Sequence, residues 1–560
     1  MKKIRELLQK RSRLLLPVIA AACLLAALAV WHWGDIQSYL GTFLGQVDLA
    51  TVREGDASGL QKDDARRRTL NIYAEDLTGA FNPAFAASAG DRAVSSAVFE
   101  PVMRRTGKGA LFPELASRVD VSDDGLAYTV RLRHGVRFSD GDELTSRDVC
   151  ASIAAMALAS GGGRGYAGIR GMEGFLARPV DWPEGLSMPD EDTAVITFDS
   201  ASPDNLAVLE TRVQKGDFMD GLADGQAFTR LQMRAQGGVG TGAYVFGAES
   251  MGGQAVLTRS DTYRRGIQDI GTVRFTSVSF YDVPEALEAG DIDLALVSGE
   301  SPLFQSFYDA PQFTIYEKPL NQLYCLEMNR NHSALRRSDV RRAVSLAIDR
   351  DALLEGGLSR YMSPAAGLPL PHTAFCADNE PDYDGKAARA LVDAYYQQAP
   401  GALTLRLPIV EGNELQRALA DGVRRQVGKA GIDVEVVALA QQDYLSEVFL
   451  QNNFDLYLTA LSLDGADASA YGQLTGDRDS LPVGIQDDAL TQAVSEAMAA
   501  YTPDRAAYAV QAVNRAANET LPVVPLAHGK QFLMVSADLK GYSASPFTGL
   551  LDNLWNIRVR

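Results

Sequence analysis

Two segments of this 560-residue chain have residue types and spacings that could do chemistry. Gly163, Gly165 and Gly168 match the GxGxxG spacing that holds dinucleotide phosphates when it follows a strand. Here the glycines follow an Ala-rich helical stretch, which favours a glycine-rich loop. Residues 120–125 (DVSDDG) begin like a calcium loop, but the twelfth position is Arg131 instead of the coordinating Glu, which favours a turn.

Other catalytic and metal-binding patterns are absent from the sequence. Phosphate-loop, zinc-protease and nucleophile-elbow motifs do not occur. The histidines are scattered without metal-ligand spacing, so we expect them on the surface or in loops; they are His32, His134, His332, His372 and His528. The sequence therefore predicts that the protein is not an enzyme and that it holds neither a metal nor a cofactor.

The four cysteines are too few for a disulfide scaffold in a chain of this length. Cys150 lies in an apolar helical context, which predicts a core residue. Cys325 and Cys376 could pair in an exported compartment, although their spacing does not decide the matter.

The N-terminal segment predicts attachment to a membrane. Residues 14–33 (LLLPVIAAACLLAALAVWHW) contain no charged side chain, and as a helix they span about 30 Å, the thickness of a bilayer core. Residues 1–13 precede them with six basic residues and one acidic residue, a net +5 that favours a cytoplasmic tip. Two alternatives are a cleaved signal peptide, which leaves a periplasmic protein, and lipidation at Cys23. In all three cases the body is exported.

Composition and charge narrow the function classes of the rest of the chain. With 46% hydrophobic and 22% charged residues, it is typical of a globular protein. The whole chain has a formal charge of −18, so the part after the +5 tip carries −23. An acidic surface repels phosphate backbones, which argues against nucleic-acid binding. It slightly favours a cationic or zwitterionic ligand. Residues 34–68 are interpreted as a spacer, with a short helix at 39–49 as the alternative.

Beyond the spacer, the hydrophobic periodicity predicts alternating strands and helices. Strands are expected at 70–74, 128–133 and 434–437. A helix is expected at 145–159, with Thr145 or Ser146 as its cap. Two further helices are predicted by apolar faces, whose residues are Val340, Ala343, Val344, Ala347 and Ile348 in one and Leu415, Leu419, Val423 and Val427 in the other. The pattern indicates an α/β fold.

One segment carries a specific family resemblance. Residues 111–149 (LFPELASRVDVSDDGLAYTVRLRHGVRFSDGDELTSRDV) closely resemble the signature of family 5 extracellular solute-binding proteins, with Val119 in place of the usual Trp. These are the dipeptide- and oligopeptide-binding components of ABC importers. Six further segments resemble family motifs in the family's order, namely 70–83, 240–244 (GTGAY), 286–294 (ALEAGDIDL), 339–349 (DVRRAVSLAID), 383–391 and 521–526 (LPVVPL). The resemblance covers about residues 69–560.

The resemblance implies a periplasmic-binding-protein-like α/β fold of the cluster C type, in which two lobes are joined by a hinge. Lobe I would comprise residues 69–318 plus 525–560, with an inserted subdomain at about 99–215. Lobe II would comprise 319–524. The segments 321–329 and 522–526 would be the hinge strands that connect them.

The resemblance also suggests site residues. In peptide-binding members an Asp in a loop meets the ligand's α-ammonium, and Asp464 takes that position here, with Asp467 in the second acidic position. Both could equally be turn-forming acids. Family Trp and Pro residues of that loop are missing here, and Ala468 replaces the Pro. The guanidinium group of Arg406 or Arg417 could bind a ligand carboxylate; the alternative is that both are surface charges.

The function implied is capture of a peptide or peptide-like ligand between two lobes and its delivery to an ABC permease. The protein would work as a monomer at the outer face of the bacterial cell membrane. A membrane-anchored ligand sensor is one alternative. A binder of a sugar, an opine or a nickel complex is another, although clustered histidines for a direct nickel site are not seen.

Overall fold

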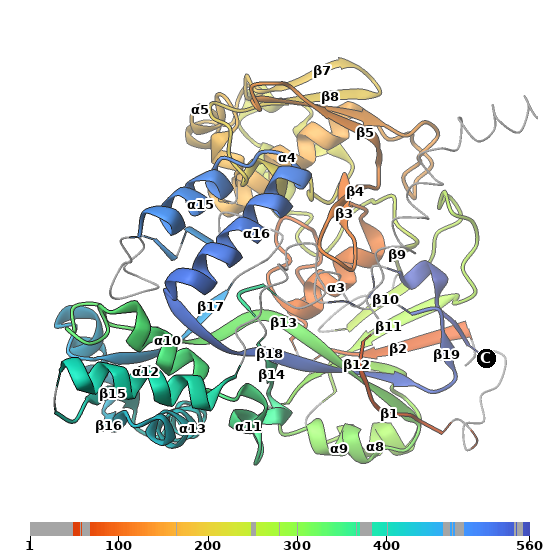
Figure 1. Ribbon diagram of the computed structural model, residues 1–560. Coiled ribbons are helices and arrows are strands. Elements are labelled where there is room, and N and C mark those ends of the chain that lie inside the picture. The colour runs from red at the N-terminus through yellow and green to blue at the C-terminus, as the bar shows by residue number, and fades with distance from the viewer. Residues whose placement is uncertain are drawn as a thin grey trace, which may run out of the picture.

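The computed structural model places most of the chain in three regions, which Figure 1 shows as lobe I, an inserted subdomain above it, and lobe II beside it. The described residues are 49–56, 58, 68–74, 76–163, 165–247, 254–278, 281–299, 301–365, 367–369, 383–399, 401–462, 471–472, 474–475, 487–542, 545, 551 and 553–559. Asp464, Asp467, Cys23 and the predicted anchor at 14–33 lie outside these residues.

Lobe I is built on a ten-stranded sheet. Eight strands follow the order β1-β13-β18-β12-β2-β11-β10-β9, and the other two are β14, which pairs with β18, and β17, which pairs with β13. At its centre β2 runs parallel to both β11 and β12. The strands of this lobe are β1 (Thr51–Arg53), β2 (Thr69–Tyr73), β9 (Tyr244–Phe246), β10 (Gln254–Arg259), β11 (Thr272–Thr276) and β12 (Leu294–Ser298). Its helices are α3 (Ala89–Val98), α8 (Val283–Glu288) and α9 (Phe304–Asp309).

Two of the family-like segments have structural roles in this sheet. In 286–294, the Asp293 carboxylate accepts a hydrogen bond from the Asn71 amide at 2.8 Å, and the Asp293 carbonyl accepts one from Ser536, so one residue links β12 to β2 and β18. In 240–244, a Cβ on Gly240 would lie 2.1 Å from the Val98 carbonyl oxygen. Glycine is therefore required where this segment passes over the end of α3.

The subdomain consists of a four-stranded antiparallel sheet covered by helices. Its sheet has the order β5-β6-β8-β7. Its elements are β3 (Met103–Arg105), β4 (Leu111–Pro113), β5 (Ala116–Val121), β6 (Ala127–Leu132), α4 (Ser146–Ser160), α5 (Met172–Ala177), β7 (Leu186–Asp190), β8 (Thr193–Thr197), α6 (Asn205–Val208) and α7 (Ala227–Gln232). The predicted cap of α4 is confirmed, because the Asp148 carboxylate accepts from both the amide and the hydroxyl of Thr145 at 2.9 and 2.8 Å.

Lobe II has a small parallel sheet and several amphipathic helices. β15 pairs in parallel with β16, and both predicted apolar helix faces are buried or half-buried in its core. Its elements are α10 (Ser338–Leu346), α11 (Arg350–Leu354), α12 (Gly385–Gln398), β15 (Thr404–Val410), α13 (Glu414–Ala430), β16 (Asp433–Leu439), α14 (Gln441–Leu445), a π-helix (Ser446–Leu450), β17 (Leu456–Ser462), α15 (Asp488–Met498) and α16 (Pro503–Thr520).

The hinge is a pair of long antiparallel strands, β13 (Phe313–Met328) and β18 (Val523–Ser536), which run from the lobe I sheet into lobe II (Figure 1). The predicted hinge segments therefore do form strands. The pairing shifts register between Pro319 and Leu323, and β14 (Met362–Pro364) adds to β18 near this point. There the Lys530 ammonium lies 2.7 Å from the Glu317 carboxylate.

Two expectations from the sequence are corrected. Residues 51–53 of the expected spacer form β1, because the Arg53 guanidinium donates to the carbonyl oxygens of Tyr308, Ala310 and Phe313 and holds the strand against β13. His528, expected on the surface or in a loop, is 2% exposed in β18, and burial lowers its pKa to about 4. The pairing of Cys325, which the sequence left open, is a separate matter: Cys325 is a buried free thiol, and Cys376 lies outside the described residues.

Two other expectations agree with the structure. The buried Cys150 is a core residue, as predicted. Residues 165–168 form a loop and a 3-10 turn after α4, which is not the strand-to-helix setting of a dinucleotide site.

None of the helices in the described part of the chain has the length and apolar content needed to cross a bilayer.

Helices α15 and α16 contact the subdomain as well as lobe II. Apolar side chains of both helices, including Leu490, Val494 and Val510, belong to the same core as the subdomain. The Tyr501 hydroxyl donates to the Asp123 carbonyl at 2.9 Å, and the Tyr128 hydroxyl donates to the Tyr501 carbonyl at 2.7 Å. The helix pair therefore forms a second connection between the two lobes, apart from the hinge.

Replacing Tyr501 tests this connection. We expect Tyr501→Ala to lower the free energy of unfolding by about 1–3 kcal/mol, because the ring loses its contact with the Arg505 guanidinium, 4.6 Å from the ring centroid, and the hydroxyl loses its bond to Asp123. Tyr501→Phe keeps the ring and removes only the hydrogen bond to Asp123, at a cost of about 1 kcal/mol. Urea denaturation measures both values. Equal values for the two variants would show that ring packing contributes nothing.

Candidate functional site

The loop after β2 forms one wall of the candidate site, and hydrogen bonds to α3 fix its position. The Asp76 carboxylate accepts from the amides of Ala89 and Gly90 at 2.9 and 2.8 Å, which satisfies two N–H groups in the first turn of α3. The buried Asp91 carboxylate accepts in return from the Thr78 amide at 2.9 Å. The family-like segment 70–83 therefore holds the loop against the helix.

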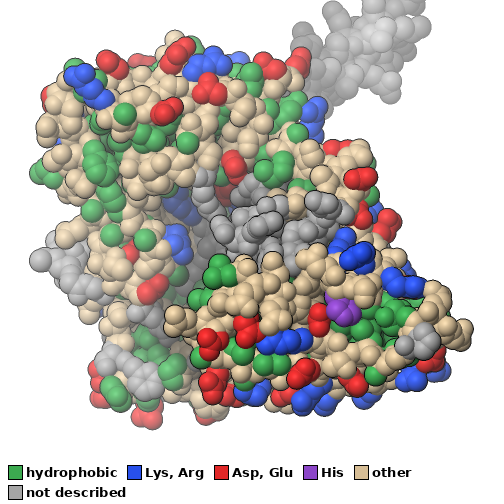
Figure 2. Space-filling model, turned by 90° about the vertical axis from the view of Figure 1, so that its left-hand side faces the viewer, with side chains coloured by type: hydrophobic (Ala, Val, Ile, Leu, Met, Phe, Trp, Pro, Cys, Tyr) green, Lys and Arg blue, Asp and Glu red, His purple; other side chains and the backbone are tan. Residues whose placement is uncertain are grey.

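A cavity of about 790 Å³ lies where lobe I, the subdomain and the hinge strands meet. Its lining comes from β2 and the loop after it, α3, α4, segments 163–166 and 207–212, and the strands β11, β12, β13 and β18. The space-filling view shows the surface hollowed between an upper part, which the subdomain forms, and a lower part (Figure 2). Its volume falls in the usual range for small-molecule sites, about 300–1,000 Å³.

The floor of the cavity includes polar side chains of the sheet. Ser298 of β12, Gln531 of β18 and Lys318 of β13 all line it. The opposite wall includes Met156 of α4 and Tyr166, whose hydroxyl lies 2.9 Å from that of Thr211. The cavity therefore combines hydrogen-bonding groups with apolar surface, which is typical of a site that binds a small polar molecule.

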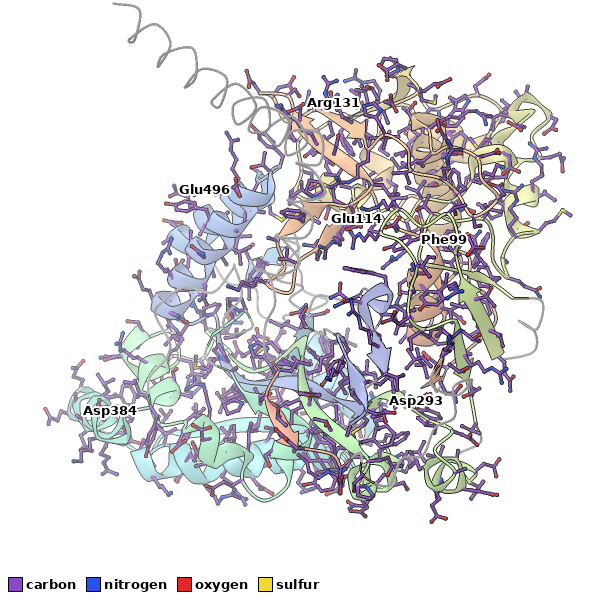
Figure 3. The ribbon with its side chains drawn as sticks, turned by 90° about the vertical axis from the view of Figure 1, so that its right-hand side faces the viewer. Phe99, Glu114, Arg131, Asp293, Asp384 and Glu496 are labelled. Atoms are coloured by element: carbon purple, nitrogen blue, oxygen red, sulfur yellow. The ribbon has the colours of Figure 1, made fainter. Side chains whose placement is uncertain are left out.

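A second, smaller cavity of about 180 Å³ adjoins a buried cluster of charged residues. The Glu114 carboxylate, 4% exposed, contacts the guanidinium groups of Arg104, Arg264 and Arg265. Burial alone would raise the pKa of Glu114, but these groups outweigh it and hold that pKa well below its usual range. Burial raises the pKa of the neighbouring Glu100 carboxyl. Figure 3 shows Glu114 between the subdomain and lobe I.

The two predicted arginines lie in lobe II. Arg406 is in β15, where its guanidinium lies 2.6 Å from the Glu447 carboxylate and also donates to the Asn453 carbonyl. Arg417 is half-buried in α13. Neither is among the described residues that line the large cavity. Asp464 and Asp467 lie outside the described residues, so their role as ligand contacts stays a prediction.

Sequence reasoning missed the cavity residues Lys318, Gln531 and Ser298. They belong to no motif, and only the strand pairing brings them together. By contrast, Asp384 of the motif at 383–391 lies at the outer edge of lobe II (Figure 3). It caps α12 by accepting from the amides of Lys386 and Ala387 at 3.0 and 2.9 Å. That motif therefore has a structural role here.

The described residues contain no group of three or more His, Cys, Asp or Glu side chains placed to hold a metal ion.

Residues 110–479, well over half of the chain, match the family of bacterial extracellular solute-binding proteins, family 5. The heme-binding protein A of Haemophilus influenzae is 23% identical over 79% of this chain and 83% of its own length. The probable di/tripeptide-binding protein 5 of Pseudomonas aeruginosa is 22% identical over 79% of this chain and 86% of its own length.

Among solved structures, the unliganded open form of the periplasmic murein tripeptide-binding protein MppA superposes with a TM-score of 0.74. It is 19% identical, and the match covers 88% of this chain and 97% of that one. The two-lobe fold with an inserted subdomain is thus shared with solved periplasmic binding proteins. Relatives of this kind are solute-binding proteins and not enzymes. The chain belongs to the family 5 extracellular solute-binding proteins, the extracytoplasmic binding components of ABC transporters.

Proposed function

We propose that this protein captures a peptide or peptide-like ligand between its two lobes and delivers it to the permease of an ABC importer. The 790 Å³ cavity with its polar floor carries the proposal, because it offers the hydrogen bonds that a peptide backbone and its termini need. Two of the similar proteins support a peptide ligand by name, one binding di- and tripeptides and the other a murein tripeptide. The ATPase that drives transport would reside in partner subunits.

The lobe boundaries and the attachment belong to the same proposal. Residues 69–318 plus 525–560 would move as lobe I against 319–524 as lobe II, about the strands β13 and β18. The chain would work as a monomer at the outer face of the membrane, held by the segment 14–33 or by lipid at Cys23. Asp464, with Asp467, would meet the ligand's ammonium group from lobe II.

Thermal unfolding of the full-length protein with di-, tri- and oligopeptides tests the ligand class. A ligand present at 100 times its dissociation constant should add about 2.7 kcal/mol to the free energy of unfolding. Native mass spectrometry of the purified protein should show a co-purified mass in the peptide range. Asp464→Asn should abolish most of the peptide-induced shift, because it removes the carboxylate expected to meet the ammonium group.

Two outcomes would contradict the peptide proposal or the role of Asp464. If no peptide raises the unfolding temperature while a sugar, an opine, heme or a nickel complex does, the peptide proposal fails and the binding function remains. Unchanged peptide affinity in Asp464→Asn would remove that residue from the site.

A further inference from the structure

The turn between β5 and β6 of the subdomain contacts the turn between α15 and α16 of lobe II. The first turn is 122–125 (SDDG), part of the segment that begins like a calcium loop, and the Gly125 amide donates to the Ser122 carbonyl at 2.9 Å to close it. Tyr501 stands in the second turn, and its hydroxyl donates to the Asp123 carbonyl at 2.9 Å. We call the meeting of 122–125 with Tyr501 the turn contact.

The ring of Tyr501 lies against the backbone of Gly125. A Cβ on Gly125 would lie only 2.6 Å from the nearest ring atom, so no side chain fits there while the turn contact is formed. The Arg505 guanidinium lies 4.6 Å from the centroid of the same ring. The buried Tyr128 donates its hydroxyl to the Tyr501 carbonyl at 2.7 Å. Both the side chain and the backbone of Tyr501 therefore bind the subdomain.

Helix α16 connects the turn contact to the hinge. It begins at Pro503, two residues after Tyr501, and it ends at Thr520, three residues before β18 begins at Val523. At 1.5 Å per residue, its 18 residues span about 27 Å. Figure 1 shows α16 rising from the hinge strands to the subdomain. Tyr501 therefore lies at the far end of a rigid helix whose other end is attached to the hinge.

This arrangement makes the turn contact sensitive to the angle of the hinge. If lobe II rotates by about 10°, a point about 27 Å from the axis moves by about 5 Å. A displacement of this size breaks both hydrogen bonds of Tyr501, because such bonds require distances of about 2.7–3.2 Å. The turn contact therefore exists only in conformations in which lobe II lies close to the subdomain.

We propose that the turn contact is a latch, which forms when the two lobes close, breaks when they open, and stabilises the closed conformation. The inference rests on the proposed movement of the lobes about β13 and β18, and it adds a site that sets the balance between the two conformations. A ligand held between the lobes favours the closed form, so a group that stabilises this form also strengthens ligand binding. Tyr501 and Gly125 are not among the described residues that line the large cavity. They would therefore act on affinity without touching the ligand.

Pulsed electron paramagnetic resonance on the full-length protein without ligand tests the latch. Nitroxide labels at Arg131→Cys in β6 and Glu496→Cys in α15 report the distance between the subdomain and lobe II, since both positions are exposed and lie outside the turn contact (Figure 3). Cys23→Ser and Cys376→Ser leave two native thiols, both buried. We expect a short distance from closed molecules and a longer distance from open ones.

The latch predicts how the ratio of closed to open molecules changes. Tyr501→Ala should lower this ratio about 10- to 30-fold, because the ring and its hydrogen bond to Asp123 are both lost. Tyr501→Phe keeps the ring and should lower the ratio about 2- to 10-fold. Tyr508→Ala is the matched control, because Tyr508 belongs to the same helix but its side chain is 68% exposed. It should keep the wild-type ratio.

Gly125→Ala tests the same contact from the subdomain. It places a methyl group where the Tyr501 ring lies, so it should open the lobes of the wild type. In the Tyr501→Ala background, where the ring is gone, the same change should leave the ratio unaltered. Strain within 122–125 alone would act equally in both backgrounds. Unfolding curves check that each variant folds, and Tyr501→Phe carries the test if Tyr501→Ala does not fold.

The outcomes separate the latch from the proposed function. If the wild type shows only the longer distance, or if Tyr501→Ala and Tyr508→Ala give the same distances, the latch is wrong and the peptide proposal stands on its own test. Equal effects of Gly125→Ala in both backgrounds would also overturn the latch. If the Tyr501 variants shift to the longer distance while no peptide binds the wild type, the latch is supported and the peptide proposal fails.

Discussion

Glu114→Gln is expected to lower the free energy of unfolding by about 3–5 kcal/mol, one of the two largest effects among the substitutions considered. The change keeps the shape of the side chain but removes the negative charge that compensates the buried guanidinium groups of Arg104, Arg264 and Arg265. These groups then remain buried without that carboxylate. Denaturation in urea at neutral pH measures the loss.

The effect should depend on pH in a defined direction. The pKa of Glu114 in the folded protein lies below its ordinary value of 4.5. The stability that its ionised form provides is therefore complete above pH 4.5 and is lost as the pH falls below it. The difference between wild type and Glu114→Gln should be constant above pH 4.5 and narrow in more acidic solution.

An exposed carboxylate provides the control. Glu143 pairs with Arg137 at 2.5 Å on the surface, where both side chains are about half exposed. Glu143→Gln should change stability by less than about 1 kcal/mol at any pH, because solvent screens such pairs. A loss in Glu114→Gln no larger than this would show that the buried cluster is not a stabilising unit.

The position of Glu114 explains why the cluster matters for binding. Glu114 follows β4 and Arg104 lies in β3, whereas Arg264 and Arg265 come from the loop between β10 and β11 of lobe I. The cluster therefore joins the subdomain to lobe I, and Figure 3 shows Glu114 between these two regions. Ser96, Glu210 and Arg212 line both the small cavity at this cluster and the large cavity. We expect weaker attachment of the subdomain to widen that cavity and to reduce ligand affinity.

Local sequence patterns predicted the helix faces and the helix cap, because interactions between residues close together in the sequence determine both. The helical face of Val340, Val344 and Ile348 is buried as expected, because a period of 3.6 residues places these side chains on one side. The cap at Thr145 was equally predictable, since Asp148 stands at the position that completes it. The two hinge strands followed from the family resemblance.

Non-local pairing determined what the sequence could not show. Ser298, Gln531 and Lys318 are separated by up to 233 positions along the chain, and they form a row only through the registers of β12, β18 and β13. The burial of His528 has the same origin, because β18 is covered by strands from distant parts of the chain. Residues 51–53 were assigned to a spacer because three residues are too few to show a strand period.

An arginine of one family motif stabilises the junction between α16 and β18. Arg341 stands in the segment 339–349 and is 5% exposed in α10. Its guanidinium donates to the carbonyl oxygens of Leu335, Arg336 and Thr520 at 3.0, 2.9 and 3.0 Å. Thr520 ends α16, so the positive charge also lies at the negative end of that helix dipole.

The junction needs this support because its backbone conformation is unfavourable. Leu521, the first residue after α16, has a φ of +50°, in the left-handed region that non-glycine residues rarely adopt. Arg330 donates to the same Thr520 carbonyl at 2.8 Å. Hydrogen bonds from lobe II therefore fix the turn through which the chain leaves α16 and enters the returning hinge strand.

Arg341→Met should lower the free energy of unfolding by about 3 kcal/mol, because the buried carbonyl of Leu335 and the part-buried carbonyl of Arg336 lose this donor. Arg342→Met, the adjacent and exposed residue of the same helix, should stay within about 0.5 kcal/mol of the wild type. Hydrogen exchange should also accelerate at residues 520–524 in the first variant alone. Similar stability and exchange in both variants would mean that the junction is held by Arg330 and strand pairing, and that the arginine of the motif is dispensable for the hinge.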